Sequence, residues 1–302
     1  MRPGITLRIL SHNREELLLQ TLDSVFAQDE PFDHIELFDN GSDFSLKEIL
    51  GRYPALHLLG LPRAVSAPEN IRRAFTQVAQ TPWICVFHDD DLMHSNFCRK
   101  TRDAILNHPE VTAVSCNGKV IDEGGNPQGN LVPSLVRDQY FNGPTDLARW
   151  YCDAFIPFPP TVYRRNAAFG ADLDFAEPYG RCGDVAFLSQ VVCRGPILLR
   201  AEQDFSYRRH GGQDSAGFKW WEETKRWELQ LQLCSENPGA CRYVKKKRNA
   251  RMTSRWLNAW LKAEAREESW DWQFFSLPAV HRFFRNNKLK ILLRLMKAGE
   301  RP

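Results

Sequence analysis

The sequence lacks any uninterrupted apolar run approaching 18 residues, so it predicts no helix that could span a bilayer. Its first residues do not show the charged, apolar and small-residue succession of a secretory signal. Among the eight cysteines there is no CxxC pair and no zinc-ribbon spacing. We therefore expect a cytoplasmic chain whose cysteines are reduced and mostly buried.

Several motifs of common enzyme classes are also missing. The chain has no GxGxxG, GxxxxGK[ST], HExxH or GxSxG sequence. These absences argue against a dinucleotide-dependent dehydrogenase, a P-loop nucleotide hydrolase, a zinc peptidase and an α/β-hydrolase. What is present is ordinary for a globular chain, since 43% of the 302 residues are hydrophobic and 25% are charged.

The net charge of +3 conceals an uneven distribution along the chain. Residues 219–302 contain 19 Lys and Arg against 9 Asp and Glu, together with seven of the nine tryptophans. Residues 1–218 are acidic in balance. We therefore predict a main domain over residues 1–218, followed by a helical, basic and tryptophan-rich region over residues 219–302.

Short apolar runs alternate with amphipathic stretches over the first hundred residues. Strands are expected at residues 5–10, 34–38, 56–59 and 83–87, with helices between them. This alternation predicts an α/β fold with a parallel sheet, in which ligands bind beyond the carboxyl ends of the strands. Polar segments follow three of these strands, at residues 11–14, 39–43 and 88–91. Together they form the candidate site.

The segment His88-Asp89-Asp90-Asp91 is the strongest of these signals. Three adjacent carboxylates repel one another and are costly to bury without a counter-ion. If the backbone is extended, Asp89 and Asp91 point to one side, and His88 and Asp90 to the other. Oxygen ligands suit Mg²⁺ or Mn²⁺, so we predict a metal site. The alternative is a solvated turn before the next helix.

The segment 39–43 allows two interpretations. A carboxylate at Asp39 can accept a hydrogen bond from a nucleobase or from ribose hydroxyls. The same Asp-Asn-Gly-Ser-Asp sequence is also common in plain turns. From these residues alone the two interpretations are equally well supported.

Taken in order, these segments resemble a known family. Asn13 and Arg14, residues 39–43, Asn70 and residues 87–91 are similar to a GT-A glycosyltransferase of family 2. The resemblance is close over residues 4–125 and looser as far as Asp184 and residues 210–212. It implies a mostly parallel sheet flanked by helices, with a nucleotide-sugar-binding half at 1–125 and an acceptor-binding half at 126–218.

The resemblance also implies an activity and roles for individual residues. The activity is transfer of a sugar from a nucleotide-diphosphate donor to a glycan or glycolipid hydroxyl, with inversion, using Mn²⁺ or Mg²⁺. The implied metal ligands are Asp91, Asp89 and His210. The implied nucleotide-sugar contacts are Ser11, Asn13, Asp39, Asn70, Asp89 and Asp90. Arg208 or Arg209 can pair with phosphate, while a lone histidine such as His210 is equally well explained as structural.

An inverting transfer needs an ionised carboxylate that takes the proton of the acceptor hydroxyl. The resemblance assigns this role to Asp184, although Gly183 replaces the first of the two carboxylates usual there. Asp172 and Asp174 are rival bases nearby. Asp184 can also be a plain carboxylate at a helix N-terminus, favoured by the helix dipole.

The basic C-terminal region suits an anionic surface. Its clusters, such as Lys and Arg at 245–248, alternate with aromatic positions, as expected of helices that lie on the cytoplasmic face of a membrane. Packing on the main domain or on a second subunit is an equal alternative. No nucleic-acid-binding motif is present, so no nucleic acid partner is expected.

The resemblance places the enzyme in surface polysaccharide or lipopolysaccharide synthesis. Two other functions stay open. One is a non-catalytic GT-A-like protein that binds partners in an assembly complex, for which Gly183 is the best argument. The other is a sugar nucleotidyltransferase, which would need a glycine-rich loop where residues 11–14 have none.

Overall fold

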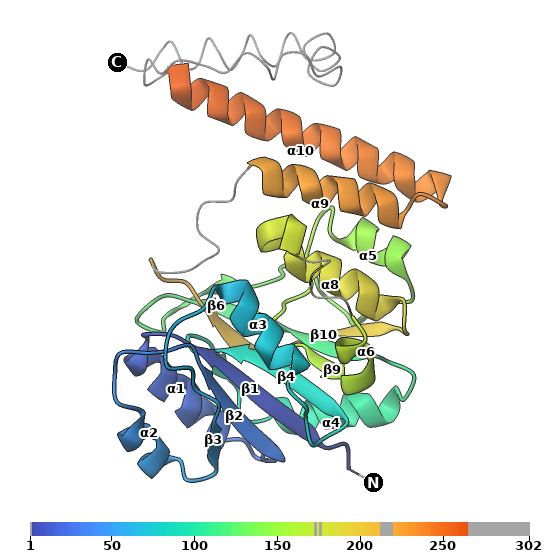
Figure 1. Ribbon diagram of the computed structural model, residues 1–302. Coiled ribbons are helices and arrows are strands. Elements are labelled where there is room, and N and C mark those ends of the chain that lie inside the picture. The colour runs from blue at the N-terminus through green and yellow to red at the C-terminus, as the bar shows by residue number, and fades with distance from the viewer. Residues whose placement is uncertain (1, 172–173, 175–176, 212–219, 265–302) are drawn as a thin grey trace. The chain divides into compact units, whose positions relative to one another are not determined.

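The computed structural model describes residues 2–171, 174, 177–211 and 220–264 (Figure 1). The chain divides into two compact units, one ending at Glu236 and the other starting at Asn237. Within the described residues, no helix is both long and apolar enough to cross a membrane. The part of the predicted C-terminal region beyond residue 264, and the rival base Asp172, lie outside the described residues.

A ten-stranded sheet forms the centre of the first unit, with the order β3-β2-β1-β4-β9-β6-β10-β5. Strands β7 and β8 pair with β6 and β10. The pairs β3–β2, β2–β1 and β1–β4 are parallel, which confirms the predicted α/β fold. The strand bounds are β1 Ile5–Ser11, β2 His34–Asp39, β3 Leu56–Leu58, β4 Trp83–His88, β5 Leu92–Met93, β6 Ala113–Ile121, β7 Pro127–Asn130, β8 Gln139–Phe141, β9 Val162–Arg164 and β10 Ile197–Arg208.

Helices flank the sheet on both faces, because alternate residues of β4 are buried in two different apolar clusters. Cys85 and Phe87 belong to the cluster with α1 and α4, and Ile84 and Val86 to the cluster with α3, α5 and α8. The helix bounds are α1 Glu15–Phe26, α2 Leu46–Arg52, α3 Ala67–Thr76, α4 Phe97–Asn107, α5 Pro144–Trp150, α6 Arg165–Phe169, α8 Gly183–Val192, α9 Trp220–Leu233 and α10 Pro238–Glu264. A 3₁₀ segment, η1, covers Glu177–Cys182.

Helix α9 follows the change in composition at residue 218 but is part of the first unit. Leu229 is buried in the second apolar cluster. Gln230 Nε2 donates to the carbonyl of Ala148 at 2.8 Å, and Thr145 Oγ1 donates to the carbonyl of Leu233 at 3.3 Å. The structural division after Glu236 therefore falls later than the compositional one, because α9 packs on α5.

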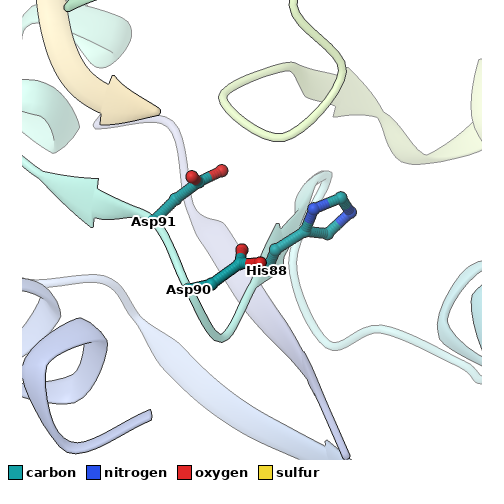
Figure 2. Close-up of side chains that lie close together, drawn as sticks. All are labelled: His88, Asp90 and Asp91. Carbon is teal, nitrogen blue, oxygen red and sulfur yellow. The ribbon is translucent and has the colours of Figure 1, made fainter. Parts of the chain in front are cut away.

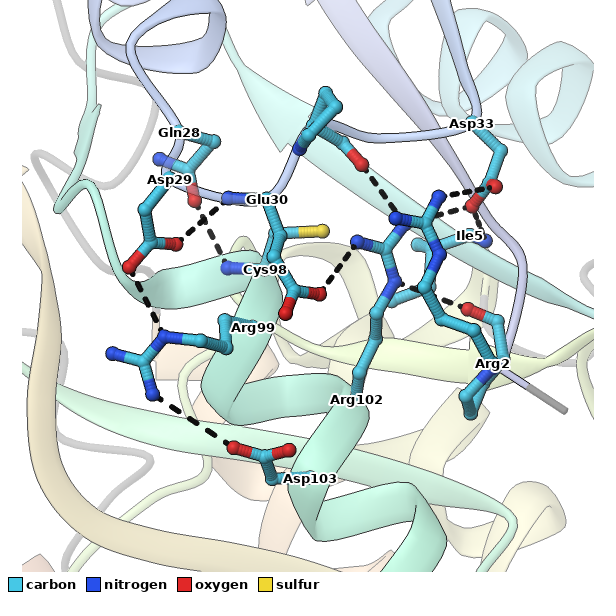
Figure 3. A network of polar contacts seen from close by, with 12 residues as sticks. Arg2, Ile5, Gln28, Asp29, Glu30, Asp33, Cys98, Arg99, Arg102 and Asp103 are labelled. Atoms are coloured by element: carbon cyan, nitrogen blue, oxygen red, sulfur yellow. Dashed lines mark hydrogen bonds and ion pairs between the residues drawn. The ribbon is translucent and has the colours of Figure 1, made fainter.

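A network of ion pairs closes the amino-terminal end of β1 and β2 (Figure 3). Arg102 of α4 is 1% exposed, and its guanidinium donates to Asp33 Oδ2 at 2.8 Å and to Glu30 Oε2 at 3.2 Å. It also donates to the carbonyls of Pro3 and Pro31. The second Asp33 oxygen accepts from Arg2 at 2.9 Å. This network fixes the N-terminal segment and the loop before β2 to α4.

Candidate active site

The carboxyl ends of β2, β1 and β4 lie next to one another. Ser11 is the register partner of Asp39, and Leu10 is the register partner of His88. The strand order 3-2-1-4 reverses direction between β1 and β4, and crevices for ligands form at such reversals in α/β sheets. The three polar segments that the sequence placed at one edge of the sheet therefore do meet there.

The acidic segment after β4 is a turn. β4 ends at His88 and the backbone turns at Asp89 and Asp90. One ligand atom each from His88, Asp90 and Asp91 lie within 4.8 Å of one another, and the three side chains extend toward the same side in Figure 2. The predicted alternation, with Asp89 and Asp91 on one side, is wrong because the backbone is not extended here.

Asp91 is the most deeply buried carboxylate of this group. It is 0% exposed, and Oδ1 accepts from the backbone N–H of Arg208 at 2.9 Å. Oδ2 is buried and has no hydrogen-bond partner within the described part of the chain. Burial, together with the negative charge of Asp90, raises the pKa of Asp91 well above its usual range. A carboxylate in this state is stabilised by a bound cation.

Asp90 connects the turn to a segment far along the chain. Its Oδ2 lies 3.0 Å from Nε2 of His210, two residues after the end of β10. The same oxygen accepts from Arg14 Nη1 at 3.1 Å. His210, which the sequence linked to the site only through the resemblance, is thus in direct contact with the acidic turn.

Asp89 is held by the loop that follows β1. Its Oδ2 accepts from the backbone N–H of His12 at 3.1 Å, and its Oδ1 accepts from Arg14 Nη1 at 3.0 Å. Burial raises the pKa of Asp89, and the positive charge of Arg14 opposes this shift. Asp89 therefore joins the acidic turn to the segment 11–14, where the buried Ser11 Oγ has no partner within the described part of the chain.

The loop after β2 is closed by its own side chains. Asp39 is 2% exposed and accepts from the backbone N–H and the hydroxyl of Ser42. Asn13, whose φ of 51° is in the left-handed region, exchanges two hydrogen bonds with Asp43 at 2.8 and 3.2 Å. These contacts place Asp39 and Asn13 beside the end of β1, and the contact of Asp39 with a nucleobase stays a prediction.

Asn70 lies on α3, against the end of β2. Its Nδ2 donates to the carbonyl of Phe38 at 3.5 Å, and its Oδ1 accepts from Arg73 Nη1 at 2.7 Å. Arg73 also donates to the carbonyl of Leu59 at 2.9 Å. Asn70 therefore connects α3 to the strand that carries Asp39.

Asp184 lies in the first turn of α8, and its hydrogen-bond partner is not one of the residues of the acidic turn. Its Oδ1 accepts from the backbone N–H of Val185 at 2.8 Å. Burial raises the pKa of Asp184 to about 6, and the nearby charge of Arg226 on α9 opposes the shift. The rival Asp174 has a side chain that is 63% exposed and forms an ion pair with Arg72. Asp184 is therefore the better placed of these two to have a perturbed pKa.

The structure changes the interpretation of Arg208. The sequence suggested that either Arg208 or Arg209 pairs with phosphate. Arg208 is 1% exposed, and its guanidinium contacts Gln20, Asp90 and Glu123. Arg209 is the exposed member of the pair. A strand-end arginine gives no signal in the sequence of whether it faces the core or the ligand, so this role could not be predicted.

We compared the chain with known protein families and with solved structures. The model of the family described as "Glycosyl transferase family 2" matches residues 6–169. No curated protein sequence matches the chain. Solved structures of S. aureus TarS are similar: TarS 1–349 in complex with UDP-GlcNAc has 16% identity and a TM-score of 0.54, covering 77% of this chain and 66% of that one.

A second TarS 1–349 structure, in complex with UDP, has 13% identity and a TM-score of 0.56, covering 83% of this chain and 71% of that one. The chain spans slightly less than two thirds of the first two TarS structures, at 65% and 66%. At this level of identity the likeness shows the fold, and the predicted GT-A architecture is confirmed.

Proposed function

Because the chain belongs to glycosyl transferase family 2, we propose that it is a metal-dependent, inverting glycosyltransferase. It moves a sugar from a nucleotide-diphosphate donor to a hydroxyl of a glycan or glycolipid acceptor. The observation that carries this proposal is the buried Oδ2 of Asp91, which has no hydrogen-bond partner among the described residues and lies in a group with Asp90 and His88 at the reversal of strand order. A buried carboxylate oxygen of this kind fits a cation.

The donor set fits Mn²⁺ or Mg²⁺. Asp90 and Asp91 supply carboxylate oxygens and His88 an imidazole nitrogen, a combination that suits Mn²⁺ better than Mg²⁺. Two other residues were predicted as ligands. Asp89 shares the side chain of Arg14 with Asp90, and His210 contacts Asp90 directly. A bound divalent cation at this place neutralises the charge of a diphosphate leaving group.

The donor lies across the ends of β1, β2 and β4 in this proposal. Its nucleobase contacts Asp39, with Ser11, Asn13 and Asn70 beside it, and its ribose and diphosphate face Asp89 and Asp90. The buried Ser11 Oγ supports this placement, because it has no partner within the described residues. TarS was solved with UDP and with UDP-GlcNAc, so a uridine diphosphate sugar is the first donor to test.

Asp184 acts as the base. Its pKa of about 6 leaves the carboxylate ionised at neutral pH and still basic enough to take the proton of an acceptor hydroxyl as that oxygen attacks. Its position at the start of α8 belongs to the half of the domain that follows the acidic turn, where the acceptor binds in this proposal.

The acceptor belongs to surface polysaccharide or lipopolysaccharide synthesis, and the chain acts at the cytoplasmic face of a membrane. Residues 242–255 of α10 support this part of the proposal, because they include seven Lys and Arg and no Asp or Glu. Arg242, Lys245, Lys246 and Arg251 are exposed. Each basic side chain near an anionic bilayer contributes about 1 kcal/mol of binding free energy.

The metal and donor sites are tested by thermal shift with UDP-, GDP-, dTDP- and CMP-sugars, each with and without Mn²⁺. We expect one nucleotide class to raise the Tm only when Mn²⁺ is present. Asp91→Ala should abolish that increase, and Asp103→Asn, an exposed carboxylate on α4, should retain it. If no donor raises the Tm under any condition, the non-catalytic, partner-binding function becomes the better one.

Membrane binding is tested separately by sedimentation with vesicles of phosphatidylglycerol and phosphatidylcholine. Lys246→Gln on α10 should weaken binding about fivefold, the equivalent of about 1 kcal/mol. Lys47→Gln on α2 removes the same charge from an exposed site and should leave binding unchanged. Equal binding by both variants would count against a membrane role for α10.

A further inference from the structure

Arg208, the last residue of β10, joins four segments that are far apart in the sequence. Its Nε donates to the carbonyl of Asp90 at 2.9 Å, and its Nη1 donates to the carbonyl of Glu123 at 2.8 Å. Its Nη2 donates to Gln20 Oε1 at 2.8 Å. Its backbone N–H donates to Asp91 Oδ1. One residue therefore contacts α1, the acidic turn and the loop after β6.

These contacts use all three guanidinium nitrogens in one fixed geometry. The side chain of Arg208 is buried, and a guanidinium presents its donors in a rigid plane. A lysine at the same position has a single nitrogen at the end of a flexible stem, and it cannot reach three acceptors that lie in different directions. The arginine is therefore specifically required for this set of contacts.

Two of the contacts fall on consecutive residues of the acidic turn. The guanidinium holds the backbone of Asp90, and the backbone N–H occupies one oxygen of Asp91. In the described part of the chain, the other oxygen, Oδ2, has no hydrogen-bond partner. The positive charge also offsets the repulsion between the two carboxylates. Arg14 and His210 contact the carboxylate of Asp90, whereas the guanidinium of Arg208 holds the backbone of the turn between the two carboxylates.

We propose that Arg208 is a positioning residue that sets the metal affinity of the acidic turn, by holding Asp90 and Asp91 in the conformation that groups their carboxylates with His88. This inference rests on the metal site of the proposed function. Arg208 itself does not bind the cation or the donor in this proposal.

The test is calorimetric titration of the full chain with Mn²⁺ alone. Arg208→Lys and Arg208→Gln should each weaken Mn²⁺ binding at least tenfold. The matched control is Arg102→Lys, because Arg102 is also 1% exposed and donates to four acceptors, but at the opposite end of the sheet (Figure 3). It should lower the Tm and leave the Kd for Mn²⁺ within twofold of wild type.

The outcomes separate the two proposals. If the wild-type chain binds no Mn²⁺, the metal site itself is overturned, and the role of Arg208 with it. If the wild-type chain binds Mn²⁺ and Arg208→Lys binds it equally well, only the role of Arg208 is overturned. The same holds if Arg102→Lys weakens Mn²⁺ binding as much as Arg208→Lys does.

A milder variant covers the case in which the Arg208 variants do not fold. Gln20→Ala removes the acceptor of Nη2 from an exposed position on α1 and keeps the arginine in place. We expect Mn²⁺ binding about threefold weaker than in the wild type, with an unchanged Tm. Unchanged Mn²⁺ affinity in Gln20→Ala would then overturn the proposal.

Discussion

Charged side chains are arranged differently at the two ends of β1. At the amino-terminal end, Asp33 accepts hydrogen bonds from the backbone of Ile5 and from Arg2 and Arg102. At the carboxyl end, Asp91 has one oxygen bonded to the backbone of Arg208 and one oxygen without a partner within the described residues. Both oxygens of Asp33 accept hydrogen bonds, whereas only one oxygen of Asp91 does so within the described residues.

The pKa shifts of the two carboxyl groups follow from this difference. Burial raises the pKa of Asp33, but its hydrogen bonds to Ile5, Arg2 and Arg102 outweigh burial and lower the pKa overall. Burial and Asp90 raise the pKa of Asp91. Asp33 therefore stabilises the fold as a charged group, whereas Asp91 is costly until a cation binds. A fold keeps a cost of this kind at sites that bind ligands.

The largest expected effect comes from the other carboxylate with a raised pKa. Asp184→Asn keeps the shape of the side chain and removes the proposed base, so we expect kcat to fall by about 10²–10⁴-fold. The Tm at pH 7.5 should not fall, because the variant removes a partly buried charge rather than a member of an ion pair. Donor-dependent thermal shift should persist. Unchanged kcat in Asp184→Asn would remove Asp184 as the base.

The comparison of the two ends is tested directly by matched Asp→Asn variants. Asp33→Asn should lower the free energy of unfolding at pH 7 by about 2 kcal/mol, because it removes a negative charge that pairs with the buried guanidinium of Arg102. Asp91→Asn should leave this free energy unchanged or raise it in metal-free buffer. Urea unfolding measures both. Equal losses in the two variants would mean that the two ends do not differ.

A third effect is the pH dependence of activity. Asp184 has a pKa of about 6 and must be ionised to act as a base, so kcat/KM should fall about tenfold per pH unit below 6. The contribution of Asp184 to the free energy of unfolding changes with pH in the opposite direction to the activity. A raised pKa means that the folded state binds the proton more tightly, so this group stabilises the fold at low pH, and that stability is lost as the pH rises through 6. An activity profile that stays flat between pH 5 and 7 would contradict the assignment.

The smallest effect concerns the exposed part of the amino-terminal network. Arg2 is 48% exposed in its ion pair with Asp33, so Arg2→Ala should lower the free energy of unfolding by about 0.5 kcal/mol, and less at high salt. The Kd for Mn²⁺ should not change. A measurable change in that Kd would show that the two ends of the sheet are coupled.

The positions of the strand ends could be predicted from the sequence more accurately than the directions of the side chains. The runs 5–10, 34–38 and 83–87 match β1, β2 and β4 closely, because an apolar run buried on both faces is a strong pattern. The expectation that Asp91 points away from His88 and Asp90 was wrong, because the backbone turns after His88. That turn is held by Arg208, and single-sequence patterns do not report a contact over 117 residues.

The division of the chain shows a similar limit. Charge and tryptophan content change at residue 218, but α9 packs on α5 through Leu229 and Gln230. The average charge of a segment does not indicate which of its helices packs on an apolar face of the main domain. A place for His210 at the metal site was expected only through the resemblance, because His210 and its observed partner Asp90 are 120 positions apart in the sequence.

The position of Arg208 has a consequence for the order in which the molecule is made. Residues 1–91 contain the strands β1 to β4 and the whole acidic turn, but the residue that holds the turn is synthesised 117 residues after Asp91. Contacts between such distant residues form late in folding, because a long loop must close first. A nascent chain that stops before β10 should therefore form its first strands while still lacking affinity for Mn²⁺.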